Sequence, residues 1–302
     1  MKKNDLPIGI ACRLDKENAI ELTGKIINYF DEKEQKIVLE NRISQRFSPH
    51  HKRALRKMSE KNTKMIISIG GDGTILRICQ NLPRKYPAPI LGINLGSVGF
   101  LDEIDAEKDG IYGILDKLIA NEYIVQRSIR LASYYRRGRL PDALNEVAIV
   151  SAKPSKVLHV GIKIDNQLLN TAYVDGVIIS TSVGSTAYCL SAGGAIVDPR
   201  LKMMQIVPIN PFAASGSLKP IVIPSTSKVE IELIRPKLNA LILVDGQSQY
   251  RSYPKDIIKV RKSQSDIKFV RLTKNIAEGF YNNLRKKILR ASHVPMEDSP
   301  EP

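Results

Sequence analysis

Hydrophobic and polar positions in the first third of the chain follow two alternating patterns. Four short runs are almost continuously apolar, as expected for strands covered on both faces of a parallel sheet: residues 6–12, 36–40, 64–70 and 89–94. Apolar residues at helical spacing predict helices over residues 17–33, 75–82 and 106–122, and the basic stretch after Pro49 is interpreted as a surface helix. Strands that alternate with helices predict a Rossmann-like α/β domain with a mainly parallel sheet.

Past about residue 122 the apolar period changes from helical spacing to alternation. Short strand-like runs separated by turn residues cover 157–165, 228–234, 239–246, 256–262 and 266–272. Repeated short strands predict an all-β, sandwich-like second domain, and a last helical pattern follows at 276–289. The predicted organisation is therefore an N-terminal α/β nucleotide- and phosphate-binding domain (1–122), a C-terminal β-rich domain (123–275), and a C-terminal helix with a tail (276–302).

Composition adds a strong positive charge to this picture. The 302 residues include 46 Lys and Arg against 31 Asp and Glu, a formal charge of +15. This surplus is typical either of an anionic partner such as a nucleotide or polyphosphate, or simply of a soluble surface. We expect no nucleic-acid partner, because no helix-turn-helix or RNA-recognition signature accompanies the charge.

Cysteine use and hydropathy indicate the compartment. Cys12, Cys79 and Cys189 are isolated along the chain, which predicts reduced thiols rather than a disulfide framework or a zinc site. Uncharged apolar runs fall short of the length that spans a bilayer. We therefore expect a cytoplasmic protein without a membrane partner.

The stretch IISIGGDGTILR (66–77) joins an apolar strand to a helix through three glycines and an aspartate. The strand would deliver Gly70 and Gly71 to the carboxyl edge of the sheet, where ligands of open α/β folds bind. Thr74 is suited to cap the following helix, whose N-terminus favours anions. Asp72 would repel bound phosphates unless it binds a metal ion or accepts a proton, and phosphoryl transfer uses both roles. Taken alone, the motif favours a tight glycine turn with an aspartate cap, because glycine turns are common.

Three further segments carry small or polar residues. GINLGSVGFL (92–101) places a second glycine set directly after a strand, so both loops would share one sheet edge. Asn145 and Glu146 precede an apolar strand, where such a pair is either a solvated strand start or a set of ligand groups. DGVIISTSVGSTAYCLSAGGAIVDP (175–199) contains a hydroxyl-rich turn followed by Tyr188, a combination suited to close recognition of a nucleoside.

Taken together, these motifs resemble the NAD kinase family (ATP- or polyphosphate-dependent) in order along most of the chain. The matching segments are GGDGT at 70–74, GINLGSVGFL at 92–101, NE at 145–146, the stretch at 175–199, LKPIVIP at 218–224, VDGQ at 244–247 and FYNNLRKKIL at 280–289. GGDGT alone also occurs in diacylglycerol-type lipid kinases, whereas its combination with NE and GSTAY is highly specific. The resemblance implies an enzyme that transfers the terminal phosphoryl group of ATP, or of inorganic polyphosphate, to the 2′-hydroxyl of the adenosine ribose of NAD, giving NADP.

The resemblance also implies roles for individual residues. Asp72 would be the catalytic residue, as proton acceptor or metal-orienting group. The phosphate- or ATP-binding residues would be Gly70, Gly71, Gly73, Thr74 and Arg77. The NAD-binding residues would be Asp72, Gly73, Phe100, Asn145, Glu146, Asp175, Thr186, Ala187 and Tyr188. Arg77 lies one helical turn past the glycine loop, from which it could reach phosphate or simply be solvated.

The expected cofactor is Mg²⁺ or another divalent cation, held mainly by the donor phosphates with Asp72 as a candidate ligand, and the expected assembly is a homo-oligomer, either dimer or tetramer. The chain departs from the family pattern at two places. Thr181-Ser182-Val183 stands where many members have Thr-Pro-Thr, and Phe212 follows Pro211 where many have His. Two other classes stay open at this point: a lipid kinase, and a non-catalytic protein that binds nucleotides or RNA.

Overall fold

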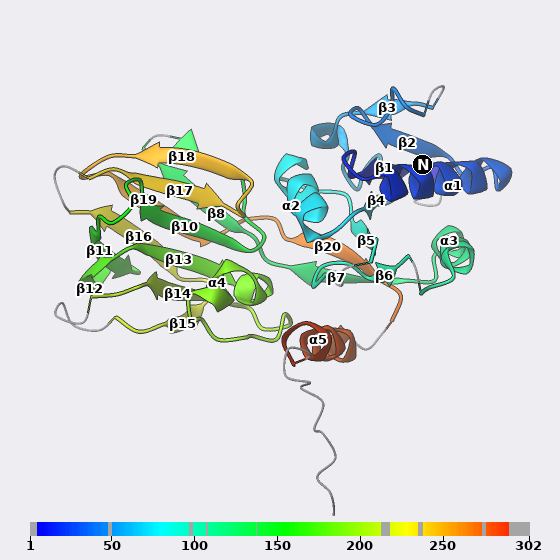
Figure 1. The fold of residues 1–302 in the computed structure, drawn as a ribbon. Helices are drawn as coiled ribbons and strands as arrows, with labels where there is room; N and C mark the ends of the chain where they lie inside the picture. Colours follow the sequence, from blue (N-terminus) through cyan, green and yellow to red (C-terminus); the bar gives the residue numbers. More distant parts are fainter. Residues whose placement is uncertain are drawn as a thin grey trace, which may run out of the picture.

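The structure is a computed structural model that describes residues 5–47, 50–96, 99–106, 108–136, 138–212, 218–234, 238–273 and 276–289. An α/β part and an all-β part lie side by side, and a C-terminal helix runs beneath their junction (Figure 1). This arrangement confirms the predicted fold class. Among the described residues, no helix is long and apolar enough to cross a membrane.

The α/β part is built on an eight-stranded sheet. Its strands are β1 (Ile8–Cys12), β2 (Ile37–Glu40), β3 (Lys52–Arg53), β4 (Ile66–Ile69), β5 (Ile90–Asn94), β6 (Ile104–Asp105), β7 (Ile124–Ser128) and β20 (Ile267–Arg271). The order is β3-β2-β1-β4-β5-β20-β7, with β6 paired to β5, and every pairing is parallel except that of β7 with β20. Strands β1, β4 and β5 are buried along their whole length, which agrees with their continuous apolar runs.

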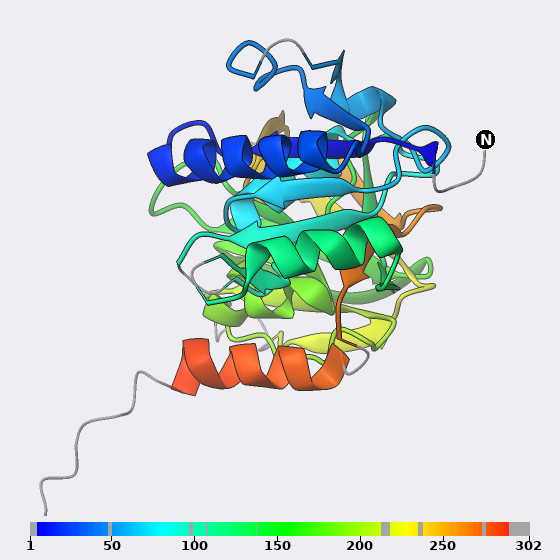
Figure 2. The ribbon, with the colours of Figure 1, turned by 90° about the vertical axis from the view of Figure 1, so that its right-hand side faces the viewer.

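Helices cover both faces of this sheet. The helices α1 (Glu17–Glu32) and α3 (Ile111–Ala120) lie over one face, where Phe30 and Leu115 pack against the apolar side chains of β1, β4 and β5 (Figure 2). The helix α2 (Asp72–Asn81) covers the other face, toward the β domain (Figure 1). Its side chains share a cluster with Phe269 of β20 and Leu144 of the β domain, so α2 lies at the contact between the two parts.

Two predicted helices differ from the structure. The basic stretch after Pro49 forms the edge strand β3 and the short 3₁₀ helix η2 (Leu55–Lys57), because its backbone pairs with β2 and its buried apolar side chains are limited to Leu55 and Met58. The helix predicted from residue 106 begins at Ile111, because residues 104–105 instead pair with β5 as β6. The other predicted helices of this part are present.

The all-β part consists of two six-stranded sheets in which every pairing is antiparallel. One sheet runs β15 (Ile221–Pro224), β14 (Met203–Ile209), β13 (Gly176–Thr181), β10 (Glu146–Ser151), β17 (Ala240–Val244), β18 (Ser248–Ser252). The other runs β12 (Gln167–Val174), β11 (Leu158–Ile164), β16 (Lys228–Leu233), β19 (Ile257–Lys262), β8 (Leu131–Tyr135), β9 (Gly138–Arg139). Val147 and Ile179 of the first sheet share one buried cluster with Val160 and Ile231 of the second, which makes the domain a sandwich.

Sheet membership departs from the predicted domain division. Strands β7 and β20, placed by the sequence in the β-rich domain of 123–275, belong to the sheet of the α/β part. Phe269 of β20 pairs with Ile90 of β5, and Ile267 pairs with Ser128 of β7. The chain therefore crosses between the two parts twice before the C-terminal helix α5 (Ile276–Leu284) and its π-helical continuation η5 (Arg285–Leu289). The predicted tail from residue 290 lies outside the described residues.

Candidate active site

Asp72 lies where the two glycine loops meet at the carboxyl edge of the sheet. It is the first residue of α2, directly after β4, and its side chain is 30% exposed. Its carboxylate accepts a backbone N–H from Phe100 and another from Leu101, each at 3.0 Å. The second loop therefore holds the Asp72 carboxylate in one orientation while leaving part of it open to a ligand.

Position 99 in the second loop has to be glycine, because two carboxyl groups lie very close to it. A side-chain carbon at Gly99 would overlap Oδ1 of Asp72 and Oδ2 of Asp102, so both oxygens face the same small space. Asp102 is only 8% exposed, and neither of its side-chain oxygens has a hydrogen-bond partner among the described residues. Burial raises the pKa of the Asp102 carboxyl to about 8, and the negative charge of Asp72 acts in the same direction.

On one side of Asp72 a cationic pocket opens at the N-terminus of α2. Its lining residues are Cys12, Arg13, Leu14, Asp15, Arg42, Gly71, Gly73, Thr74, Arg77 and Gln247. Side-chain carbons at Gly71 or Gly73 would meet no atom within 4 Å, so the backbone is open to a close ligand. An α-helix N-terminus flanked by arginines and bare glycines is chemically suited to bind phosphate.

Of the predicted phosphate-binding residues, Gly71, Gly73, Thr74 and Arg77 line this pocket, whereas Gly70 lies behind it. Gly70 has a φ of +150°, and a side-chain carbon there would lie 2.5 Å from Oγ1 of Thr74, so it shapes the turn. Arg77 forms a bidentate ion pair with Glu40, with N–O distances of 2.5 and 2.8 Å. The positive charge of the Arg77 guanidinium is therefore already balanced by the Glu40 carboxylate where it faces the pocket.

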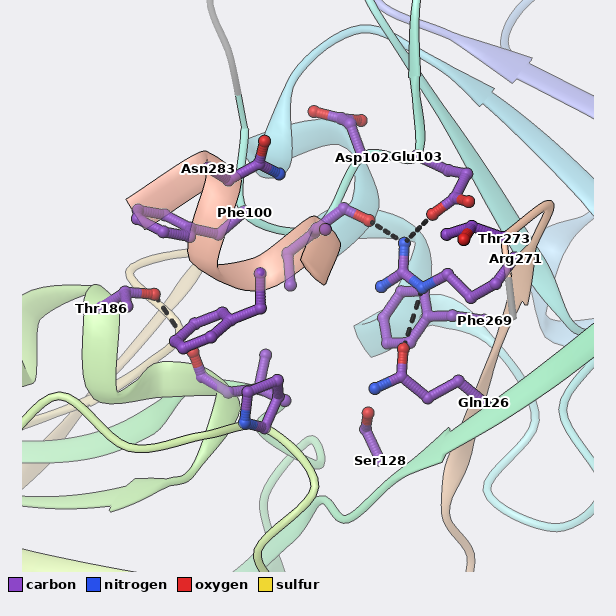
Figure 3. Close-up of a pocket in the computed structure, with 15 residues that line it drawn as sticks. Phe100, Asp102, Glu103, Gln126, Ser128, Thr186, Phe269, Arg271, Thr273 and Asn283 are labelled. Carbon is purple, nitrogen blue, oxygen red and sulfur yellow. Dashed lines mark hydrogen bonds and ion pairs between the residues drawn. The ribbon is translucent and has the colours of Figure 1, made fainter. Parts of the chain in front are cut away.

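On the other side of Asp72 a second pocket lies between the two domains and α5 (Figure 3). It is lined by Phe100, Leu101, Asp102, Glu103, Gln126, Ser128, Val183, Thr186, Pro199, Phe269, Arg271, Thr273, Gly279, Phe280 and Asn283. Arg271 donates to Gln126 at 2.8 Å and to Glu103 at 3.1 Å, while the Asp102 carboxylate points away from Arg271 (Figure 3). Phe100 and Thr186, predicted from separate motifs, therefore line one cavity.

Asn145 and Glu146 are held by a third buried carboxylate. Asp245 accepts the backbone N–H groups of Leu144, Asn145 and Glu146 at 2.8, 2.8 and 3.1 Å, which produces the bend at the start of β10. Glu146 is 6% exposed and its Oε2 has no hydrogen-bond partner among the described residues. Burial, followed by the charge of Asp245, raises the pKa of Glu146 to about 8. Burial likewise raises the pKa of Asp245 to about 6.

The GSTAY turn packs directly on this bend. Gly184 begins the turn, and a side-chain carbon there would overlap the backbone of Asn145. Oγ1 of Thr181 donates to the Leu144 carbonyl at 2.7 Å and accepts from the Gly184 amide at 3.1 Å, so the Thr181 hydroxyl of the divergent tripeptide is used structurally. Ala187 leads into the short helix α4 (Tyr188–Ser191), where the Tyr188 side chain remains 41% exposed.

Asp175 is not brought to this site within one chain. It precedes β13, and the register pairs Gly176 with Val150 at one end of β10 but Ser180 with Glu146 at the other. Asp175 therefore lies at the opposite end of the strand, where it accepts from Asn210 at 2.9 Å. Phe212, the second departure from the family pattern, lies in the segment just after β14 at this far end and is 59% exposed.

Several residues of the site were absent from the sequence predictions. Asp102 follows the second glycine loop directly, and Asp245 stands in the VDGQ segment, so each adjoins a motif that could have indicated it. Arg13 and Arg42 follow β1 and β2, and a search of every strand end at this sheet edge would have found them. Lys287, within the matching segment at 280–289, reaches Asp72 from the C-terminal helix at 3.9 Å, a contact that the segment itself does not indicate.

Comparisons with known proteins agree along the whole chain. Residues 8–123 match a family model described as ATP-NAD kinase N-terminal domain, and residues 144–272 match ATP-NAD kinase C-terminal domain. The NAD kinase of Methanothermobacter thermautotrophicus is 36% identical over 282 residues, covering 93% of this chain and 96% of that protein. The NAD kinase of Pyrococcus furiosus is 36% identical over 284 residues, with 93% and 100% covered.

Solved structures show the same fold. An NAD kinase from Archaeoglobus fulgidus in complex with ATP aligns with a TM-score of 0.73 at 28% identity, covering 93% of this chain and 99% of that one. Yeast NADH kinase complexed with NADH aligns with a TM-score of 0.83 at 23% identity, covering 97% and 90%.

Proposed function

Since the chain belongs to the NAD kinase family, we propose that it forms NADP by moving the terminal phosphoryl group of ATP, or of inorganic polyphosphate, onto the 2′-hydroxyl of the adenosine ribose of NAD. The observation that supports this most directly is the position of Asp72. Its chain neighbours Gly71 and Gly73 line the pocket at the helix N-terminus, and its carboxylate accepts from the backbone of Phe100, which lines the second pocket.

The proposed reaction is a direct transfer. The bond between the terminal phosphorus and its bridging oxygen breaks, the 2′-oxygen forms the new bond, and the electron pair leaves on ADP or the shortened polyphosphate. Asp72 accepts the hydroxyl proton or orients the nucleophile. The two backbone N–H groups from Phe100 and Leu101 keep the carboxylate aimed while it does so.

We propose that the donor phosphates bind at the N-terminus of α2, over Gly71 and Gly73. Backbone amides there are unhindered by side chains, and Arg13, Arg42 and Arg77 line the pocket with their guanidinium donors, although Asp15 pairs with Arg13 and Glu40 with Arg77. The formal charge of +15 would favour the approach of any polyanionic donor, so we propose both ATP and polyphosphate as donors.

The site's donor groups fit a hard divalent cation such as Mg²⁺. Asp72 and the orphaned oxygens of Asp102 are carboxylates, the ligand type that this ion prefers, although no cluster of three or more metal-binding side chains occurs among the described residues. Phosphate oxygens of the donor would therefore supply most of the ligands, with Asp72 as the candidate protein ligand. When bound, the ion would neutralise charge on the phosphates.

The test is NADP formation by purified protein with NAD and Mg²⁺, run in parallel with ATP and with polyphosphate. The matched variant Asp72→Asn keeps the size of the side chain and is expected to lower kcat by roughly 10²–10⁴-fold, the usual contribution of a positioned acid–base group. Circular dichroism and the urea midpoint control for folding. Turnover close to wild type in folded Asp72→Asn would remove Asp72 from the mechanism, and no NADP from folded wild-type protein would reject the function.

A further inference from the structure

The last helical segment of the chain places a lysine at the proposed transfer site. Nζ of Lys287 lies 3.9 Å from Oδ2 of Asp72 and 4.7 Å from the centroid of the Phe100 ring. This puts a full positive charge beside the carboxylate that is expected to meet the acceptor hydroxyl. The lysine comes from η5, more than 200 residues after Asp72 in the chain.

The segment that carries Lys287 is fixed to both domains. Nδ2 of Asn283 donates to the carbonyl of Gly99 at 3.3 Å, in the loop that orients Asp72. The hydroxyl of Tyr281 donates to Asp198 of the β domain at 3.1 Å. These two contacts lie within one turn of α5 and define where the following residues are placed.

Two other cations near the site already have donors engaged. Arg77 forms a bidentate pair with Glu40, and the guanidinium of Arg271 contacts Glu103 and Gln126. Lys287 differs because its separation from Asp72 exceeds the 2.7–2.9 Å of a charge-assisted hydrogen bond. An ammonium group has three donors, and the side chain remains 35% exposed, so it can bind further oxygens.

We propose that Lys287 is a catalytic residue whose ammonium contacts the phosphoryl group during its transfer. The inference rests on the proposed function. In the transferring state negative charge spreads over the three equatorial oxygens of the phosphoryl group, while the bridging oxygen takes the electron pair and Asp72 takes the hydroxyl proton. A cation beside Asp72 is correctly placed to stabilise those oxygens, and it simultaneously offsets the repulsion between the Asp72 carboxylate and the incoming phosphate.

The experiment compares Lys287→Met with Lys287→Arg and with the matched control Lys286→Met. Lys286 is the preceding residue of the same π-helical turn and is exposed, and it lines a pocket with Asp102 and Asp105 that does not include Asp72 or Phe100. We expect Lys287→Met to lower kcat by roughly 10²–10³-fold, as for removal of one preorganised donor, with a much smaller change in the KM for NAD. Lys287→Arg should recover much of kcat, and Lys286→Met should behave as wild type.

A binding measurement separates a catalytic role from a structural one. Calorimetry with MgADP and aluminium fluoride in the presence of NAD reports affinity for a mimic of the transferring phosphoryl group. Lys287→Met should weaken this complex by a factor close to its loss in kcat and leave MgADP binding within a few-fold of wild type. Equal losses for both ligands, or turnover matching Lys286→Met, would overturn the proposal. If wild-type protein formed no NADP, the proposed function would fail, and the fluoride complex would still decide the role of Lys287.

Discussion

Replacing Arg77 by methionine tests whether this residue mainly supports the fold or mainly binds the donor. Its partner Glu40 ends β2 with a side chain that is 4% exposed, whereas the Arg77 side chain is 21% exposed. Methionine fills a similar volume but leaves the Glu40 carboxylate buried without its cation. Removing one partner of a buried ion pair typically costs 3–5 kcal/mol. The partial exposure of Arg77 gives water some access, so we expect a loss of about 3 kcal/mol, the lower end of that range.

The assay is urea unfolding followed by circular dichroism, without nucleotides. A loss of about 3 kcal/mol corresponds to a midpoint shift of about 1 M at a slope of about 3 kcal/mol per M. The double variant Glu40→Gln/Arg77→Met removes both charges and should recover most of the loss, because no uncompensated carboxylate remains. An unchanged urea midpoint in Arg77→Met, combined with a large rise in the KM for ATP, would refute this reasoning and assign Arg77 to the donor instead.

Two further predictions concern the phosphate loop and pH. Gly73→Ala should raise the free energy of unfolding by about 0.5–1 kcal/mol, like the matched α3 control Gly113→Ala, since neither methyl group meets an atom within 4 Å. Only Gly73→Ala should raise the KM for ATP, by about tenfold, because its methyl group would occupy the phosphate's approach, and equal KM values would contradict a donor site there. With the pKa values of Asp102 and Glu146 raised to about 8, the folded state keeps protons that the unfolded chain loses above about pH 4, so unfolding free energy should fall as pH rises from about 4 through about 8 and then level off. Urea titrations of Asp102→Asn/Glu146→Gln should show a flatter pH dependence than wild type, and an identical slope would contradict the assignment.

The β4–α2 unit was predictable because its signals are local. A run of four buried residues, three of them isoleucines, ends at Ile69, glycines follow, and apolar side chains such as Ile75 and Ile78 then recur at helical spacing. The sandwich was predictable for the same reason, since several of its strands alternate buried and more exposed residues, as Lys228–Leu233 and Ile257–Lys262 do. Each of these patterns depends on neighbours a few residues apart.

Sheet membership and the contacts of the site were not predictable in this way. The run at Ile267–Arg271 has the same short-strand signal as the sandwich strands, yet Phe269 pairs with Ile90, far away in the sequence. No local sequence pattern shows whether such a strand joins the sandwich or the sheet of the α/β part. The approach of Lys287 to Asp72 depends on the same return of the chain to the α/β part.

The buried carboxyl groups around the site are expected to lower the free energy of unfolding to different extents. Asp245 is also buried, but three backbone N–H groups stabilise it, and its pKa rises only to about 6. Asp102 and Glu146 have oxygens without hydrogen-bond partners among the described residues, and burial raises the pKa of each to about 8. An unpartnered buried polar group destabilises a fold, so apolar residues would be expected at both positions if folding alone mattered. Asp102 lies beside Asp72, and Glu146 follows Asn145 in the chain. Buried carboxyl groups next to predicted ligand-binding residues are expected when ligand binding, rather than core packing, determines which groups are buried.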